Sequence, residues 1–243
     1  MLRPRPTRIA ATALFVAVAV ALTLPPLAAE PAAAATAASS CGKWHSIPTA
    51  TGIPEAAFFA GAQISSTDVW AGGRQGTDGL LEHWDGHAWT QASAPFPSNP
   101  DTEITGLAAI SSDDIWAVGS SNGLPGQPFI LHFDGSAWSL VPSPAPASGT
   151  QVALAAVSAS GQDDVWAAGY VLDTSTDQYT WTNLVEHWDG QAWSVVDAPS
   201  LVPGSDTLSG VTAIAPDDVW VVGNNGMTAH WNGNAWTVVS NPF

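Results

Sequence analysis

The sequence predicts an all-β protein built from one four-stranded unit that occurs four times. Two motifs recur in all four copies, and no window shows the 3.6-residue periodicity of an amphipathic helix. The first motif reads SSTDVWAGG, SSDDIWAVG, GQDDVWAAG and APDDVWVVG, and the second reads HWDGHAW, HFDGSAW, HWDGQAW and HWNGNAW. The last Trp of the second motif recurs at positions 89, 138, 193 and 236. Such a period indicates a repeat architecture.

Each repeat divides into four short strands. The first is apolar, as in GLAAIS at 106–111, and a tight acidic turn joins it to an IWAVG-type second strand. A variable loop leads to the third strand, FILHF at 129–133. Asp-Gly or Asn-Gly, the strongest short-range hairpin signal, then leads to the fourth, AWSLV at 137–141. The expected units cover about residues 56–95, 104–144, 152–199 and 208–242.

Repeated four-stranded antiparallel units predict a β-propeller, in which each blade packs both faces against its neighbours. Burial on both faces explains why the second strand is apolar at nearly every position. GKWHSIP, around Trp44, repeats the end of a unit, so we expect four blades plus one extra edge strand at 43–48. A five-bladed or incompletely closed ring is the alternative.

The blade motifs resemble known propeller families. VWAGG followed by HWDGHAWTQASAP resembles the kelch and galactose-oxidase blade, and DDVWVVGNNGMTAHWNGNAW is similar to sialidase-repeat and photosystem-assembly-factor propellers. Two features depart from these families. Only the first unit carries a double glycine, Gly72–Gly73, and the Asp-box spacing D-x-G-x-x-W reads D-G-x-x-W here. These families include enzymes, lectins and scaffolds, so the resemblance implies a fold and not a function.

Residues 1–39 are predicted to be a secretory signal peptide and an Ala-rich linker. Arg3, Arg5 and Arg8 precede an uncharged apolar run at 9–24, and small residues follow. The run is shorter than the roughly 20 residues that a membrane-spanning helix needs. We therefore expect a secreted protein with its propeller at 40–243. Retention by an uncleaved N-terminal anchor is the alternative.

The expected mature domain is strongly acidic. It keeps Lys43 and Arg74 against 20 Asp and Glu residues, a formal net charge of −18. Such a charge disfavours nucleic acid as a partner and, after signal cleavage, a membrane surface. The single cysteine, Cys41, excludes an internal disulfide, so packing must supply the stability. We expect a monomer.

The polar residues that recur in every unit are expected to be structural. Four histidines share one position on the third strand and cannot converge on one metal; they are His83, His132, His187 and His230. Short polar residues fill the hairpin turns: Asp85, Asp134, Asp189 and Asn232. The acidic pairs at 113–114, 163–164 and 217–218 are interpreted as turns, with structural calcium as the alternative. No other cofactor or metal is expected.

No catalytic residue is predicted. The chain has no Cys–His pair and no nucleotide-binding loop. The alternative is a glycan-processing hydrolase or lyase. It would use two carboxylates on the variable-loop face, such as Asp173 or Asp177 with Glu103 or Asp206.

The largest departure from the repeat is the candidate binding site. YVLDTSTDQYTWTN, at 170–183, holds both tyrosines of the chain and the one tryptophan outside the repeat positions. Aromatic faces beside carboxylates and amides are typical of a neutral-sugar site. The expected ligand-binding residues are Asp173, Asp177, Tyr179, Trp181 and Asn183, with Arg74 on the same face. Alternatively, the segment is a lengthened hairpin whose aromatics cover its own strands, and Arg74 pairs with a neighbouring acid.

The sequence thus predicts a secreted, non-catalytic binding module that recognises an extracellular or cell-wall glycan, or a protein partner, through its variable-loop face. A purely structural propeller scaffold is a further alternative. Function is placed on this face because variable loops held by a rigid scaffold are where binding residues concentrate.

Overall fold

The computed structural model describes residues 46–50, 55–98, 101–121, 126–144, 150–175, 178–200 and 203–239. The regular structure in these residues is β-strand, apart from one 3-10 turn, η1 (Asn224–Gly226). No helix among them has the length and apolar character needed to cross a membrane. The predicted all-β class is confirmed.

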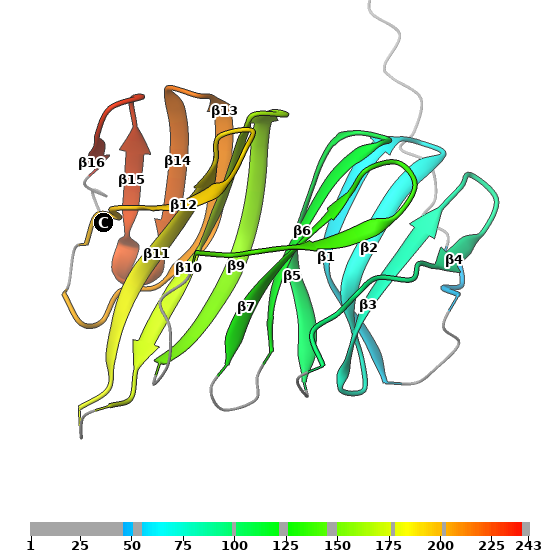
Figure 1. Ribbon diagram of the computed structural model, residues 1–243, viewed down its shortest axis with the longest axis horizontal. Coiled ribbons are helices and arrows are strands. Elements are labelled where there is room, and N and C mark those ends of the chain that lie inside the picture. Colours follow the sequence, from blue (N-terminus) through cyan, green and yellow to red (C-terminus); the bar gives the residue numbers. More distant parts are fainter. Residues whose placement is uncertain are drawn as a thin grey trace, which may run out of the picture. The chain divides into compact units, whose positions relative to one another are not determined.

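The strands form four antiparallel sheets of four consecutive strands each, here called units 1 to 4 (Figure 1). Unit 1 contains β1 (Ala56–Ser65), β2 (Asp68–Gln75), β3 (Asp78–Trp84) and β4 (Trp89–Gln91). Unit 2 contains β5 (Thr102–Ser111), β6 (Asp114–Ser121), β7 (Gln127–Phe133) and β8 (Trp138–Val141). Unit 3 contains β9 (Thr150–Gly161), β10 (Asp164–Asp173), β11 (Thr180–Trp188) and β12 (Trp193–Val196). Unit 4 contains β13 (Leu208–Ala215), β14 (Asp218–Gly223), β15 (Thr228–Trp231) and β16 (Trp236–Val238).

The Asp-Gly and Asn-Gly turns close the outer hairpin of every unit. Their glycines all have positive φ, between 86° and 93°, which a side chain rarely adopts. The residue before each glycine accepts two backbone N–H groups; in unit 1, Asp85 accepts those of His87 and Ala88 at 2.8 and 2.9 Å. In unit 2 a hydrogen bond from the Ser136 hydroxyl, helped by the backbone N–H groups of Ala137 and Ser136, lowers the pKa of the Asp134 carboxyl to about 2. The repeated acids of these turns therefore hold the backbone.

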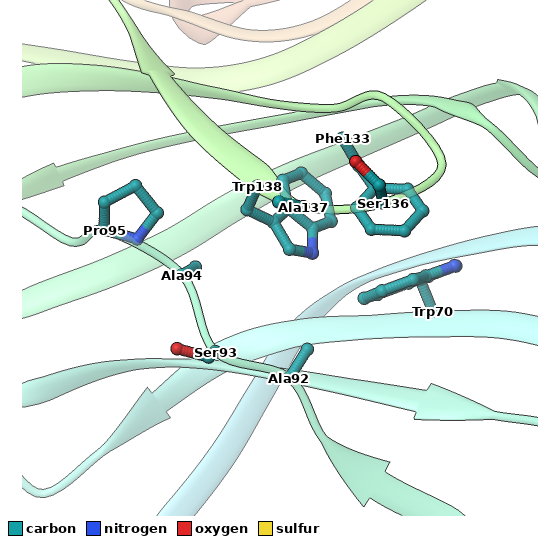
Figure 2. Close-up of a pocket in the computed structure, with 9 residues that line it drawn as sticks. All are labelled: Trp70, Ala92, Ser93, Ala94, Pro95, Phe133, Ser136, Ala137 and Trp138. Atoms are coloured by element: carbon teal, nitrogen blue, oxygen red, sulfur yellow. The ribbon is translucent and has the colours of Figure 1, made fainter.

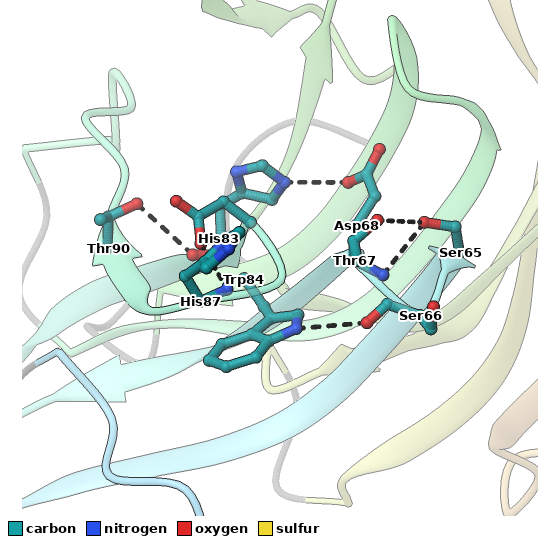
Figure 3. A network of polar contacts seen from close by, with 9 residues as sticks. Ser65, Ser66, Thr67, Asp68, His83, Trp84, His87 and Thr90 are labelled. Atoms are coloured by element: carbon teal, nitrogen blue, oxygen red, sulfur yellow. Dashed lines mark hydrogen bonds and ion pairs between the residues drawn. The ribbon is translucent and has the colours of Figure 1, made fainter.

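The repeated histidines join the second and third strands of each unit. In unit 1 the Nε2 atom of His83 lies 2.9 Å from Asp68 Oδ1 (Figure 3). The imidazole stacks on Trp70 with ring centroids 4.5 Å apart. The other three units repeat both contacts, with Nε2–Oδ1 distances of 2.8 to 2.9 Å and ring separations of 4.1 to 4.5 Å. As the repeat predicted, this histidine belongs to the scaffold.

Three hydrophobic clusters lie between successive units and form the core. The second strand contributes to clusters on both of its sides, and every residue of β6 is buried. The first strands pack in chain order, β1 on β5, β5 on β9 and β9 on β13. The four sheets confirm the predicted blades, and they do not close into a ring.

The expected extra strand at 43–48 is only partly covered by the structure. Residues 46–48 are described and contain no strand, whereas residues 43–45 lie outside the described part of the chain. The backbone N–H of Ala50 donates to Glu82 Oε2 at 3.1 Å, so this segment crosses unit 1 next to its third strand.

Candidate functional site

The segment that breaks the repeat is an elongated hairpin of β10 and β11. These strands have ten and nine residues, compared with eight and seven in units 1 and 2. The antiparallel ladder continues out to the pair Asp173 and Thr180. The lengthening predicted as the alternative interpretation is therefore present. It carries Trp181 beyond the first residues of β3 and β7, whereas Tyr170 lies at the level of Arg74 in β2 and Ser120 in β6.

Two of the aromatic residues in this hairpin meet. Tyr170 pairs with Asn183 across the ladder, and side chains two residues apart on a strand share one face, so Trp181 lies diagonal to Tyr170. The ring centroids are 5.0 Å apart, with an interplanar angle of 60°. The N–H of Trp181 also donates to the carbonyl of Gly204 at 3.0 Å, which ties β11 to the segment that leads into unit 4.

These two rings line one cavity of about 330 Å³ together with Ser205, Thr207 and Asn224. We call it the aromatic pocket. The side-chain amide of Asn224 holds the backbone of the two hydroxyl residues in place. Its Nδ2 atom donates to the Ser205 carbonyl and its Oδ1 atom accepts the Thr207 N–H, both at 2.8 Å. The pocket thus combines an aromatic surface from unit 3 with hydroxyls and an amide next to unit 4.

Tyr170 also contacts a second, small polar cavity of about 30 Å³ that Ser120, Ser121 and Gln151 help to line. Partial burial raises the pKa of the Tyr170 phenol, and the negative charge of Glu103 raises it further. The phenol therefore remains a neutral hydrogen-bonding group throughout the neutral pH range.

Those of the other predicted site residues that the structure describes do not line the aromatic pocket. Tyr179 is 67% exposed near the hairpin end. Asn183 Nδ2 donates to the Pro199 carbonyl at 2.7 Å, so this amide ties the hairpin to the chain that follows β12. Arg74 lies on β2 in unit 1 and forms no ion pair with any other described residue. Asp177 lies outside the described residues.

Two of the carboxylates considered for catalysis, Asp173 and Asp206, are engaged elsewhere. Asp173 Oδ1 accepts the backbone N–H of Ser175 at 2.8 Å, and the side-chain and backbone bonds from Ser175 lower the pKa of this carboxyl. Asp206 is 1% exposed and accepts the Ser200 hydroxyl at 2.7 Å. Neither lines the aromatic pocket. In the described part of the chain, no three His, Cys, Asp or Glu side chains are grouped as metal ligands would be.

Three further grooves repeat at the junctions between units. The groove between units 1 and 2 has a volume of about 540 Å³ and is lined by Trp70, Phe133 and Trp138 with residues 92–95 (Figure 2). The equivalent groove between units 2 and 3 has a volume of about 350 Å³, and the one between units 3 and 4 has a volume of about 480 Å³. Trp138 is only 6% exposed, so its ring mainly packs the junction. The aromatic pocket differs from these grooves because residues that depart from the repeat build it.

Of the residues predicted for ligand binding, Trp181 lines the aromatic pocket, and Tyr170, Ser205 and Thr207 line it as well although the sequence did not predict them. Tyr170 was visible as one of only two tyrosines in the chain. Ser205 and Thr207 carry no sequence signal, because their contribution depends on how unit 4 lies against the hairpin.

Several solved structures resemble part of this chain, each at a TM-score below 0.5. No family model matches the chain, and no curated protein does either. A solved structure of YCF48 bound to a D1 peptide has a TM-score of 0.37 at 17% identity, covering 80% of this chain and 75% of that one. The six-bladed, fucose-recognising lectin of Aleuria aurantia has a TM-score of 0.46 at 14% identity, covering 75% of this chain and 62% of the lectin. A GH74 xyloglucanase from Xanthomonas campestris has a TM-score of 0.40 at 9% identity, over 75% of this chain and 38% of the enzyme.

The chain's own four antiparallel sheets of four strands place it in the β-propeller class, with four units that do not close into a ring. The chain spans less than two thirds of the lectin and of the xyloglucanase. The likeness concerns the fold, and the ligand must be argued from the aromatic pocket itself.

Proposed function

We propose that this protein is a secreted, non-catalytic carbohydrate-binding protein and that the aromatic pocket is its binding site. One observation carries the proposal: the segment that departs from the repeat brings Tyr170 and Trp181 together, 5.0 Å apart, in a pocket edged with hydroxyls and an amide. Ligand sites are commonly concave, with aromatic walls and a few placed polar groups. The pocket has this composition.

A neutral sugar matches the chemistry of the pocket. The apolar C–H face of a pyranose can pack on the indole of Trp181, and the sugar hydroxyls can exchange hydrogen bonds with Ser205, Thr207 and the neutral phenol of Tyr170. Acids exceed bases by 16 charges over the whole chain, which disfavours anionic polysaccharides. We therefore propose a neutral extracellular or cell-wall glycan as the ligand.

The proposal is tested by glycan-array and insoluble-polysaccharide binding of the chain expressed with its own N-terminus, beside two single variants. Trp181→Ala removes one wall of the pocket and is expected to lower affinity at least tenfold. Tyr179→Ala, on the exposed part of the same hairpin, is the matched control and is expected to bind like the parent protein. Melting temperatures of all three proteins establish that folding is intact.

Equal binding by the parent and Trp181→Ala would exclude the aromatic pocket. Loss of binding only in Tyr179→Ala would move the site to the hairpin end. If the parent binds no glycan, a protein partner on the same face becomes the favoured hypothesis. Mass spectrometry of the N-terminus in culture medium and in membranes tests secretion separately, since a retained anchor would leave residues 1–39 attached.

A further inference from the structure

Every junction between units buries a second-strand tryptophan under two rings of the following unit. Trp70 lies beneath Phe133 and Trp138 of unit 2, with centroid separations of 5.1 and 5.3 Å. Trp116 has the same contacts with Trp188 and Trp193 of unit 3. Trp166 has them with Trp231 and Trp236 of unit 4. The three covered tryptophans are only 4%, 2% and 1% exposed.

The equivalent surface of unit 4 is uncovered. Trp220 keeps the contacts within its own unit, stacking on His230 at 4.5 Å, but contacts no ring of another unit within the described chain. Val222 is 47% exposed, whereas Val118 and Ala168 at the same position are fully buried by the next unit. Ile214, beside them, is 63% exposed. We call Ile214, Trp220 and Val222 the open face of unit 4.

Unit 1 carries the complementary half of a junction. The ring centroids of Trp84 and Trp89 lie 5.9 Å apart with an interplanar angle of 47°. The pair that covers Trp116, Trp188 and Trp193, has a similar centroid distance of 6.2 Å and the same angle of 47°. No described second-strand tryptophan lies beneath this pair. The small apolar residues next to it, Val69 and Ala71, are half-buried, whereas their equivalents in the other units are fully buried. Val69, Ala71, Trp84 and Trp89 form the open face of unit 1.

We propose that the open face of unit 4 in one copy of the chain binds the open face of unit 1 in a second copy. The two faces are the halves of a junction that the chain already forms three times, so the contact continues an existing interface. Head-to-tail contacts of this kind close into rings when the rotation permits. Two copies would form a ring of eight units, within the roughly four to eight blades of known propellers.

A polar contact of one existing junction also has counterparts on the two faces. The Thr105 hydroxyl donates to the Leu154 carbonyl across the junction between units 2 and 3, at 2.6 Å. The strand register places Ser209 at the position of Thr105 and Phe58 at that of Leu154. Ser209 is exposed on unit 4. In the second copy it would donate to the Phe58 carbonyl.

Residues 46–50 leave room for the second copy because they occupy the place of a linker. Between units 2 and 3, the linker residue Ser143 donates to the buried carboxylate of Glu186 on the third strand. Ala50 makes the corresponding contact with Glu82 in unit 1. The chain thus supplies its own linker at this face, and a second copy needs to add only its sheet.

The test measures the molar mass of the full chain, produced with its own N-terminus, by light scattering between 1 and about 100 μM. The parent is expected at twice the chain mass. Val222→Asp places a charge on the open face of unit 4 and is expected to yield the single-chain mass. Val195→Asp is the matched control, because Val195 is 50% exposed on β12 outside both faces, and it should remain a dimer. Circular dichroism verifies that both variants fold.

A mixing experiment distinguishes the head-to-tail contact from other dimers. Trp89→Ala damages only the open face of unit 1, and Val222→Asp only that of unit 4. Each variant alone should be a monomer, and an equimolar mixture should form a one-to-one complex through the two intact faces. A single-chain mass for the parent at every concentration, or a Val222→Asp protein that stays dimeric, would overturn the proposal. Trp181 lies on neither face, so the two proposals fail independently. Sugar binding can be absent while the chain dimerises, and the chain can be a monomer while it binds sugar.

Discussion

At the scale of single residues, the buried acids of the third strand depend on the linkers that cross them. Glu186 accepts the Ser143 hydroxyl at 2.8 Å, and the two residues come from different units. At the same position, unit 2 has Leu131, and the residue that packs near it from the linker is Ala94. An acid therefore occurs in unit 3 where the linker provides a hydroxyl, and an apolar side chain occurs in unit 2 where the linker does not.

Burial of Glu186 has a consequence for stability against pH. Removal from water raises the pKa of its carboxyl from an ordinary 4.5 to about 7, although the Ser143 hydrogen bond partly opposes the rise. The folded state therefore holds this proton more tightly than the unfolded state. This contribution to stability is fully present below pH 4.5 and is lost as pH rises through 7.

We expect Glu186→Gln to remove this pH dependence. The parent should lose about 3 kcal/mol of unfolding free energy between pH 4.5 and 8 through this group, at about 1.4 kcal/mol per pKa unit, whereas the variant should not. Urea unfolding at several pH values gives the difference between the two proteins. Ser143→Ala should raise the pKa further. A parallel pH dependence in the parent and in Glu186→Gln would contradict the assignment.

At the scale of the elements, the hairpin turns show why Gly follows Asp or Asn in each unit. Gly135 has a φ of +86°, and a Cβ atom there would lie 2.6 Å from the Cβ of Asp113 in the preceding turn. The turn between the third and fourth strands therefore packs closely on the turn between the first and second. The close packing of the two turns explains why both turn sequences recur together in each unit.

Gly135→Ala is expected to destabilise the protein by about 1–2 kcal/mol, because it forces a left-handed backbone on a residue with a side chain. The contact with Asp113 should add to this effect. Gly161→Ala is the matched control. Its φ is not positive, and apart from its chain neighbours no atom lies within 4 Å of the place that a Cβ atom would take, so it should change stability by less than about 0.5 kcal/mol. Thermal or urea unfolding measures both, and equal effects would contradict the turn argument.

At the scale of the whole molecule, stability resides in the three junctions between units. Each junction joins a second-strand tryptophan to an aromatic pair from the next sheet, and no sheet buries both faces by itself. The units at either end of the described chain have only one neighbour within it. This is the physical origin of both open faces and of the proposed dimer.

We expect Trp116→Ala to lower the free energy of unfolding by about 3–5 kcal/mol, because it opens a cavity between units 2 and 3 that the sheets cannot easily fill. Trp116 is 2% exposed and contacts Trp188 and Trp193. Trp181→Ala, in the elongated hairpin, should change stability much less. Urea unfolding compares the two, and a similar loss in both would contradict the central role of the junctions.

Most of the architecture could be predicted from the sequence because it depends on neighbouring residues. Period, strand pattern and Asp-Gly turns are local signals, and they predicted four four-stranded sheets with structural histidines. The candidate site could be predicted only in part, and its role in binding stays a prediction. Trp181 was chosen because it departs from the repeat, and it lines the aromatic pocket. The expected grouping with Tyr179 was not seen in the pocket, since the ladder places Tyr170 diagonal to Trp181.

By itself, the sequence determined that this protein is a repeated, all-β, acidic chain whose distinctive side chains lie in one long loop segment. Only the tertiary structure decided which of those side chains line a pocket, that Ser205 and Thr207 complete it, and that no ring of another unit in the described residues covers the half-buried Trp220. The physical reason is that strand and turn formation depend on residues close in the chain. A pocket or a junction instead depends on the packing of units whose residues are far apart in sequence.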